Sequence, residues 1–196
     1  MKALVYHGAR DIRFETHDDP TIRADTDAIV KVDLCSICGS DLHIFHGHGF
    51  SADTRYCVGH EAVGEVVEVG KGVRRLRPGD KVMISAAVGC GHCAPCLAGQ
   101  VNRCLTGSMN CYGLSLGLEG SQAEAFRVPA ADVNATAMPE GLTPTQALML
   151  TDSMATAWYG CKQARIRPGR QVVVVGLGPI GLMAVEAALV MGASAV

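Results

Sequence analysis

Short runs of alternating apolar and polar residues dominate the first two thirds of the chain, and glycine, aspartate and proline residues separate them. The runs cover residues 3–6, 12–15, 28–32, 62–70, 81–84 and 122–129. A period of two with frequent turn residues is typical of antiparallel strands. The pattern therefore predicts a small β-barrel or a partly open sandwich.

The pattern changes after residue 142. Thr143-Pro144 indicates a helix start, with threonine as N-cap and proline at the first helical position. Further on, the apolar run Val172–Val175 is of the kind found in a buried parallel strand, and a helical pattern follows from Leu182 to Met191. A strand followed by a helix predicts the start of an α/β unit.

Three glycines lie between that strand and that helix, at positions 176, 178 and 181. A G-x-G-x-x-G pattern in this setting lets the backbone approach a pyrophosphate at the positive end of the helix. We therefore predict that NAD or NADP is bound at Gly176, Gly178, Pro179, Ile180 and Gly181. The residue that selects between the two cofactors would lie about 20 residues beyond the glycines, past Val196, so the choice stays open.

The stretch from Val172 to Val196 carries Glu186 as its only charge and is long enough to span a bilayer. Its glycines and Pro179 divide it into short pieces, which favours strand, turn and helix over a membrane span. We expect no membrane partner.

Composition excludes several classes of protein. With 196 residues, 48% of them hydrophobic, the chain can bury a core and form one large domain or one domain and part of another. A net charge of −2 and 5% aromatic residues argue against a nucleic-acid partner. The apolar run near Met1 is too short for a secretory signal, so we expect a cytoplasmic location.

In that compartment the nine cysteines are expected to bind metal, to act in catalysis or to pack in the core. Cys90, Cys93, Cys96 and Cys104 have the spacing C-x2-C-x2-C-x7-C, which predicts a closed structural zinc site with four thiolates. An iron–sulfur cluster is the alternative, but the bacterial cluster motif has its fourth cysteine after three residues, followed by proline.

A second group of metal ligands is found in Cys38-Gly39-Ser40-Asp41-Leu42-His43 and in Gly59-His60-Glu61. Cys35 and Cys38 could form a redox dithiol or a zinc pair. We prefer Cys38 as a single ligand that acts with His60 and a carboxylate, which leaves Cys35 as a buried small residue. Asp152 is either a helix cap or that carboxylate. His7 and His17 have no partner at ligand spacing and are interpreted as structural histidines.

Together with Thr151-Asp152 and the glycine pattern, these motifs resemble the zinc-dependent medium-chain alcohol dehydrogenase family along the whole chain. The resemblance implies an α+β fold: a GroES-like β-barrel catalytic domain over residues 1–150, then the beginning of an α/β Rossmann domain over residues 151–196. Many members have cysteine where this chain has Asp152, which places it nearer to the bacterial secondary-alcohol branch. The resemblance also implies that the chain is truncated within the cofactor domain.

The resemblance further implies the chemistry. Catalytic zinc would be held by Cys38, His60 and Asp152, with Glu61 as a possible further ligand, and would lower the pKa of an alcohol so that hydride can leave to NAD(P). Ser40 would take the proton and pass it through the cofactor ribose towards His43, and Asp41 would orient His60.

The expected substrates are primary or secondary alcohols, polyols and the matching aldehydes or ketones, and the expected assembly is a homo-oligomer, a dimer or a tetramer. Two alternatives remain at this point. The first is a non-catalytic zinc-binding fragment or interaction module that cannot complete a cofactor site. The second is a zinc-independent quinone reductase of the same architecture.

Overall fold

The computed structural model describes residues 1–106, 111–115 and 117–196. They divide into two compact units, Met1–Leu148 and Met149–Val196.

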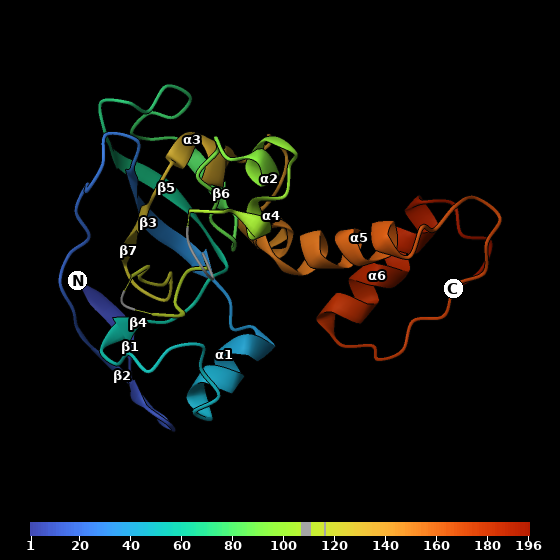
Figure 1. Cartoon of the computed structure of the whole chain (residues 1–196), viewed down its shortest axis with the longest axis horizontal. Helices are drawn as coiled ribbons and strands as arrows, with labels where there is room; N and C mark the ends of the chain where they lie inside the picture. Colours follow the sequence, from blue (N-terminus) through green and yellow to red (C-terminus); the bar gives the residue numbers. More distant parts are fainter. Residues whose placement is uncertain (107–110, 116) are drawn as a thin grey trace. The chain divides into compact units, whose positions relative to one another are not determined.

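The first unit contains two antiparallel sheets (Figure 1). The smaller has the order β2–β1–β4, formed by Asp11–Thr16, Lys2–Gly8 and Tyr56–Cys57. The larger has the order β7–β3–β5–β6–β8, formed by Ala125–Val128, Ala28–Cys35, Ala62–Val69, Lys81–Ile84 and Ala135–Ala137. Each predicted run overlaps one of these strands.

Residues 122–124 join the two sheets. The amide of Leu4 in β1 donates to the carbonyl of Gln122 at 2.9 Å, and the amide of Val32 in β3 donates to the carbonyl of Glu124 at 2.9 Å. One short segment therefore bonds to a strand of each sheet. This continuity is what a partly open barrel requires.

The main core lies on the inner face of the larger sheet, where Val30, Val66, Val82 and Phe126 are almost fully buried. Core residues occupy alternate positions along single strands, such as Val82 and Ile84 in β6 and Phe126 and Val128 in β7, as expected for strands with one face covered. Gly64 in β5 allows close approach, because a Cβ there would lie 2.1 Å from the carbonyl oxygen of Lys31.

Short helices fill the connections of the first unit. They are α1 (Gly39–Phe45), α2 (Ala94–Leu97), the 3₁₀ helix η1 (Val101–Arg103) and α3 (Ala131–Asn134). Helix α4 (Pro144–Thr151) begins as predicted. The Thr143 hydroxyl accepts a hydrogen bond from the amide of Gln146, and the Gln146 side chain accepts one from the amide of Thr143, which together form a capping box.

The second unit is formed by α5 (Ser153–Gln163) and α6 (Pro179–Val190), which pack against each other around Cys161, Ala187 and Ala188 (Figure 1). The predicted buried strand at Val172–Val175 is wrong. Only one parallel bridge, between Gln171 and Ala195, forms among the described residues there, and Val175 is 95% exposed. A parallel strand needs hydrogen-bonded neighbours along its length, and this bridge pairs only one end of the run.

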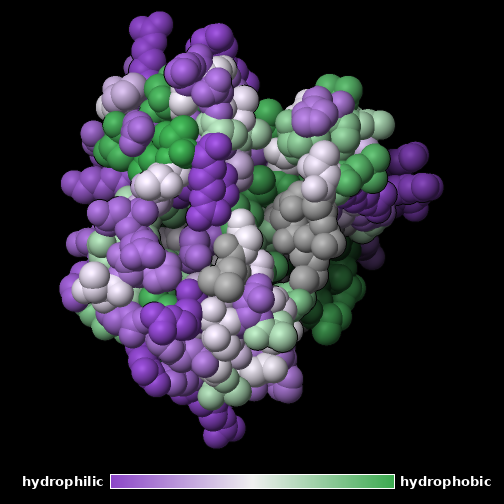
Figure 2. Space-filling model, turned by 60° about the vertical axis from the view of Figure 1, so that its left-hand side comes forward, coloured by the Kyte–Doolittle hydropathy of each residue, from purple (hydrophilic) through white to green (hydrophobic). Residues whose placement is uncertain are grey.

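No helix in the described part of the chain is both long and apolar enough to cross a membrane. Hydrophilic side chains cover most of the face shown in Figure 2, and apolar side chains gather there in smaller patches.

Candidate functional site

The four cysteines predicted as a zinc site lie together in the first unit. Their sulfur atoms are all within 4.8 Å of one another. The Sγ atoms of Cys90 and Cys96 are 4.0 Å apart, and those of Cys93 and Cys104 are 3.9 Å apart. Zinc–sulfur bonds of about 2.3 Å in a tetrahedron place the sulfurs about 3.8 Å apart, so the four side chains fit a zinc ion.

Tight turns bring these sulfurs together. The amide of Cys93 donates to the Sγ of Cys90 at 3.4 Å, and the amide of Cys90 donates to the Sγ of Cys104 at 3.4 Å. Gly89 is required by packing, because a Cβ at this position would lie 2.9 Å from the Sγ of Cys96. The backbone is thus folded around the sulfurs and donates to them directly.

The thiols of this lobe differ in acidity. Hydrogen bonding with Thr106 lowers the pKa of Cys104 to about 6, whereas desolvation raises the pKa of Cys96 to about 11. A hydrogen bond from the backbone of His92 lowers the pKa of Cys90. A metal ion bound here takes all four sulfurs as thiolates, so binding releases the protons of those that are still thiols.

Asn134 anchors the lobe to the barrel, a role that the sequence did not reveal. Its side chain accepts a hydrogen bond from the amide of Gly89 at 2.8 Å and donates to the carbonyl of Gly89 at 2.8 Å. It also donates to the carbonyl of Pro129. No local motif marks this asparagine, because its partners lie 45 and 5 residues away in the chain.

The second predicted group is built around Asp41, which is 5% exposed in the first turn of α1. Its Oδ2 accepts hydrogen bonds from the amide of Cys38 at 2.8 Å and from the Gln122 side chain at 3.2 Å. Its Oδ1 lies 3.4 Å from the Nδ1 of His60. The carboxylate therefore faces one ring nitrogen of His60 and holds the backbone of Cys38.

His60 is also buried, at 4% exposure, and its Nε2 lies 3.2 Å from the hydroxyl of Ser40. Because Nδ1 faces Asp41, Nε2 is the ring nitrogen placed to bind a metal. The Gln122 side chain, which the sequence analysis missed, ties this group to the backbone by donating to the carbonyl of Ser36 at 3.1 Å.

The neighbouring predicted residues take different positions. Glu61 is 3% exposed and accepts a hydrogen bond from the hydroxyl of Ser36. Ser40 is half-buried, and His43, three residues later on α1, is exposed. Cys35 is half-buried at the end of β3, where burial, and then the charge of Asp41, raises the pKa of its thiol.

Asp152 belongs to the second unit, where it occupies the N-cap position of α5 directly after α4. Its side chain makes no capping hydrogen bond to the first turn of that helix. Instead, its Oδ1 accepts a hydrogen bond from the hydroxyl of Thr156 at 2.8 Å. Asp152 thus occupies the N-cap position, but its carboxylate bonds to the Thr156 side chain and does not cap the helix.

The glycine pattern has the local geometry that a pyrophosphate site needs. Gly176 has φ of +91°, and Gly178 is the N-cap of α6, which begins at Pro179. A Cβ at Gly181 would lie 1.9 Å from the carbonyl oxygen of Gly176, so the turn closes only with glycine there. Ile180, 41% exposed, is in the first turn of the helix.

Comparisons with known proteins identify the family of the chain. Residues 24–140 match the family described as "Alcohol dehydrogenase GroES-like domain". The chain is 41% identical over 196 residues to a probable zinc-binding alcohol dehydrogenase of Mycobacterium tuberculosis, covering all of this chain and 50% of that protein.

Two solved structures are similar over nearly the whole chain. Alcohol dehydrogenase TADH from Thermus sp. ATN1 is 40% identical with a TM-score of 0.93, over 99% of this chain and 56% of that one. Acetophenone reductase from Geotrichum candidum, in complex with NAD, is 27% identical with a TM-score of 0.84, over 99% of this chain and 56% of that one. The chain spans about half the length of the relatives that it matches.

Proposed function

Since this chain belongs to the zinc-dependent medium-chain alcohol dehydrogenase family, we propose that the whole protein transfers hydride reversibly between an alcohol and NAD or NADP. The observation that carries the proposal is the arrangement of two buried residues, Asp41 and His60, with the half-buried Ser40, in which one imidazole nitrogen lies beside a hydroxyl. The substrates we propose are primary or secondary alcohols or polyols, and aldehydes or ketones in reverse.

Cys38, His60 and Asp152 are the proposed ligands of a catalytic zinc ion. One thiolate, one imidazole and one carboxylate form a donor set that leaves the fourth tetrahedral position to substrate. Zinc bound there would supply Lewis acidity, lowering the pKa of an alcohol. Two features favour a role for Asp152 as a zinc ligand over a role as a simple helix cap. Its side chain does not cap α5, and one of its oxygens is already oriented by Thr156. Glu61 is buried and directly follows His60 in the sequence. We propose that it orients the backbone near the zinc ligands through its hydrogen bond with Ser36.

The chain's own residues would handle the proton. Ser40 lies beside the Nε2 of His60, so its hydroxyl is placed to accept a hydrogen bond from a substrate hydroxyl at the open position. His43 lies three residues further along the same helix and is exposed, so it can exchange a proton with water. Asp41 keeps the His60 ring fixed while this happens.

The two remaining predicted sites have supporting roles in this proposal. The lobe of Cys90, Cys93, Cys96 and Cys104 would hold a structural zinc ion, because its four ligands leave no open position. The backbone from Gly176 to Gly181 would bind the cofactor pyrophosphate at the start of α6. The nicotinamide would supply the hydride acceptor.

The test compares Cys38→Ser with Cys35→Ser in the full-length protein. Cys38→Ser should abolish alcohol-dependent NAD(P) reduction and remove one zinc ion per chain, with the zinc of the four-cysteine lobe retained. Cys35→Ser changes a half-buried thiol three residues away and should keep both activity and zinc content. Full activity in Cys38→Ser would refute the assignment.

A further inference from the structure

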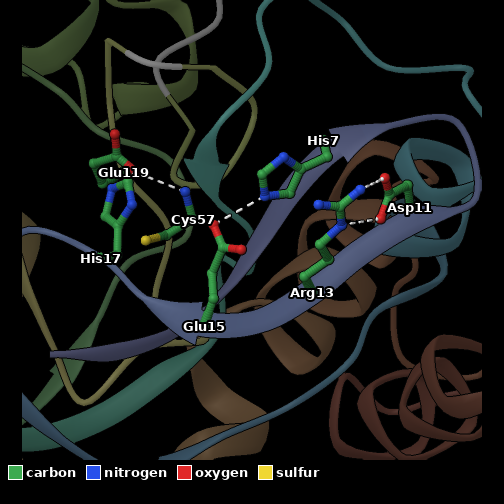
Figure 3. A network of polar contacts seen from close by, with 7 residues as sticks. All are labelled: His7, Asp11, Arg13, Glu15, His17, Cys57 and Glu119. Atoms are coloured by element: carbon green, nitrogen blue, oxygen red, sulfur yellow. Dashed lines mark hydrogen bonds and ion pairs between the residues drawn. The ribbon is translucent and has the colours of Figure 1, made fainter.

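Three side chains outside the sites described above converge in the first unit. His17 follows β2, Cys57 is the last residue of β4, and Glu119 comes from the segment before β7 (Figure 3). We propose that they bind a divalent transition-metal cation, with Zn²⁺ as the preferred ion, at a site separate from the two proposed zinc sites. One nitrogen, one sulfur and one oxygen ligand suit zinc.

The distances fit one ion. A side-chain ligand atom from each of the three residues lies within 4.8 Å of the other two. The Nε2 of His17 is 3.6 Å from the Oε2 of Glu119. Nitrogen and oxygen ligands bound to zinc at about 2.0–2.1 Å in a tetrahedron are roughly 3.3 Å apart, so a small side-chain movement completes the geometry.

Surrounding backbone holds each ligand in place. The same Oε2 of Glu119 accepts a hydrogen bond from the amide of Cys57 at 2.6 Å, which fixes the carboxylate, and a carboxylate oxygen has a second lone pair that can face a cation. The backbone of His17 exchanges two hydrogen bonds with Met1, at 2.9 and 3.0 Å. Supporting contacts of this kind orient the ligands of a metal site.

Cys57 is fully buried and pairs with Val5 in the smaller sheet. Burial, together with the neighbouring charge of Glu119, raises the pKa of its thiol. Burial therefore favours the protonated form of the Cys57 sulfur when no cation is bound. A bound divalent cation would take this sulfur as a thiolate.

A cavity borders two of the three ligands. Its volume is about 130 Å³, and it is lined by His17 and Glu119, together with Asp18, Asp19 and Arg127. A cavity of roughly 10–15 Å³ already holds one water, so this cavity can supply a water as fourth ligand. The positive charge of Arg127 is offset by Asp27, whose Oδ2 lies 3.1 Å away.

His7 provides a matched control on the same sheet. Its Nε2 lies 2.9 Å from the Oε1 of Glu15, so it is also a histidine beside a glutamate (Figure 3). Among the described residues, however, this pair belongs to no group of three or more metal-binding side chains.

The experiment measures zinc per chain by mass spectrometry after equilibration with buffered Zn²⁺, for the wild type, His17→Gln, Glu119→Gln and His7→Gln. Glutamine at 119 keeps an oxygen that can accept the bond from Cys57. We expect His17→Gln and Glu119→Gln each to bind one zinc ion fewer than the wild type, and His7→Gln to bind the same number. Equal zinc content in all four folded proteins would overturn the proposal.

A second measurement needs no variant. Anomalous diffraction at the zinc edge from wild-type crystals soaked in Zn²⁺ should give a peak among the three side chains. Peaks at the other zinc sites with none at this one would also overturn the proposal. Loss of activity in Cys38→Ser tests a different ion, so the two proposals can fail separately.

Discussion

Asp41 is a single buried carboxylate with three different partners. Its Oδ2 accepts hydrogen bonds from the amide of Cys38 and from the side chain of Gln122, and its Oδ1 faces the Nδ1 of His60. Burying a charge is costly unless it is paired or hydrogen-bonded, and here the partners also position two proposed zinc ligands. The residue therefore couples the stability of this region to the geometry of the site.

Asp41→Asn tests this role. An amide in place of the carboxylate keeps the volume but weakens the interaction with Nδ1, and changes of this kind typically reduce metal affinity about 10–100-fold. The affinity of the Cys38–His60 site should fall by this amount when zinc is titrated against a competing chelator. The control is Asp33→Asn, which removes the surface ion pair with Lys81 and should leave affinity unchanged. A zinc affinity of Asp41→Asn equal to that of the unmodified protein would contradict the proposed role of Asp41.

Residues within one motif could be predicted from the sequence, because a short loop keeps them together. Cys38, Ser40 and Asp41 are an example, and Gly176 and Gly181 are another. Partners that meet only through the fold could not be predicted. The two proposed partners of His17 are far from it in the sequence: Cys57 lies 40 residues away, and Glu119, which His17 faces, lies about a hundred.

Among the elements, the four-cysteine lobe depends most on one external contact. Asn134, at the end of α3, pairs with both backbone groups of Gly89 at the start of the lobe. It is almost fully buried, so loss of its side chain would leave the amide and carbonyl of Gly89 without this partner in a buried setting. One amide side chain thus links the start of the lobe to α3.

Asn134→Ala should therefore destabilise the first unit by about 1–3 kcal/mol, the cost of leaving buried polar groups unpaired. Urea unfolding monitored by circular dichroism measures this change, and zinc retention by the lobe should fall in parallel. Asn102→Ala, at an exposed position of η1, is the matched control and should change stability little. A stable Asn134→Ala protein would show that the lobe is held elsewhere.

The strands show the limit of periodicity as a signal. The six runs with alternating residues each overlap a strand, whereas β4 and β8, of two and three residues, are too short to show a period. At Val172–Val175 the pattern was wrong in the opposite direction. The apolar run predicted a strand, but no strand forms at these described residues because only one end of the run has a hydrogen-bonded neighbour. Sequence reports which residues favour a sheet, but pairing decides whether a strand forms.

At the scale of the whole molecule, the two units differ in how completely they bury their apolar residues. In the first unit, both sheets contribute to continuous cores in which most large apolar side chains are buried. In the second, Val173, Val175 and Val190 are 86%, 95% and 75% exposed. Large apolar side chains that are exposed in this way favour association with another surface.

We therefore expect the 196-residue chain to self-associate as its concentration rises, with sedimentation velocity as the measurement. Val173→Ser combined with Val175→Ser should shift the distribution towards the monomer, because it removes two of the most exposed apolar side chains. Leu97→Ser changes a residue of the four-cysteine lobe that is 74% exposed, and it should leave the distribution as it is. A single monomeric species at all concentrations in the unmodified chain would mean that these valines do not drive association.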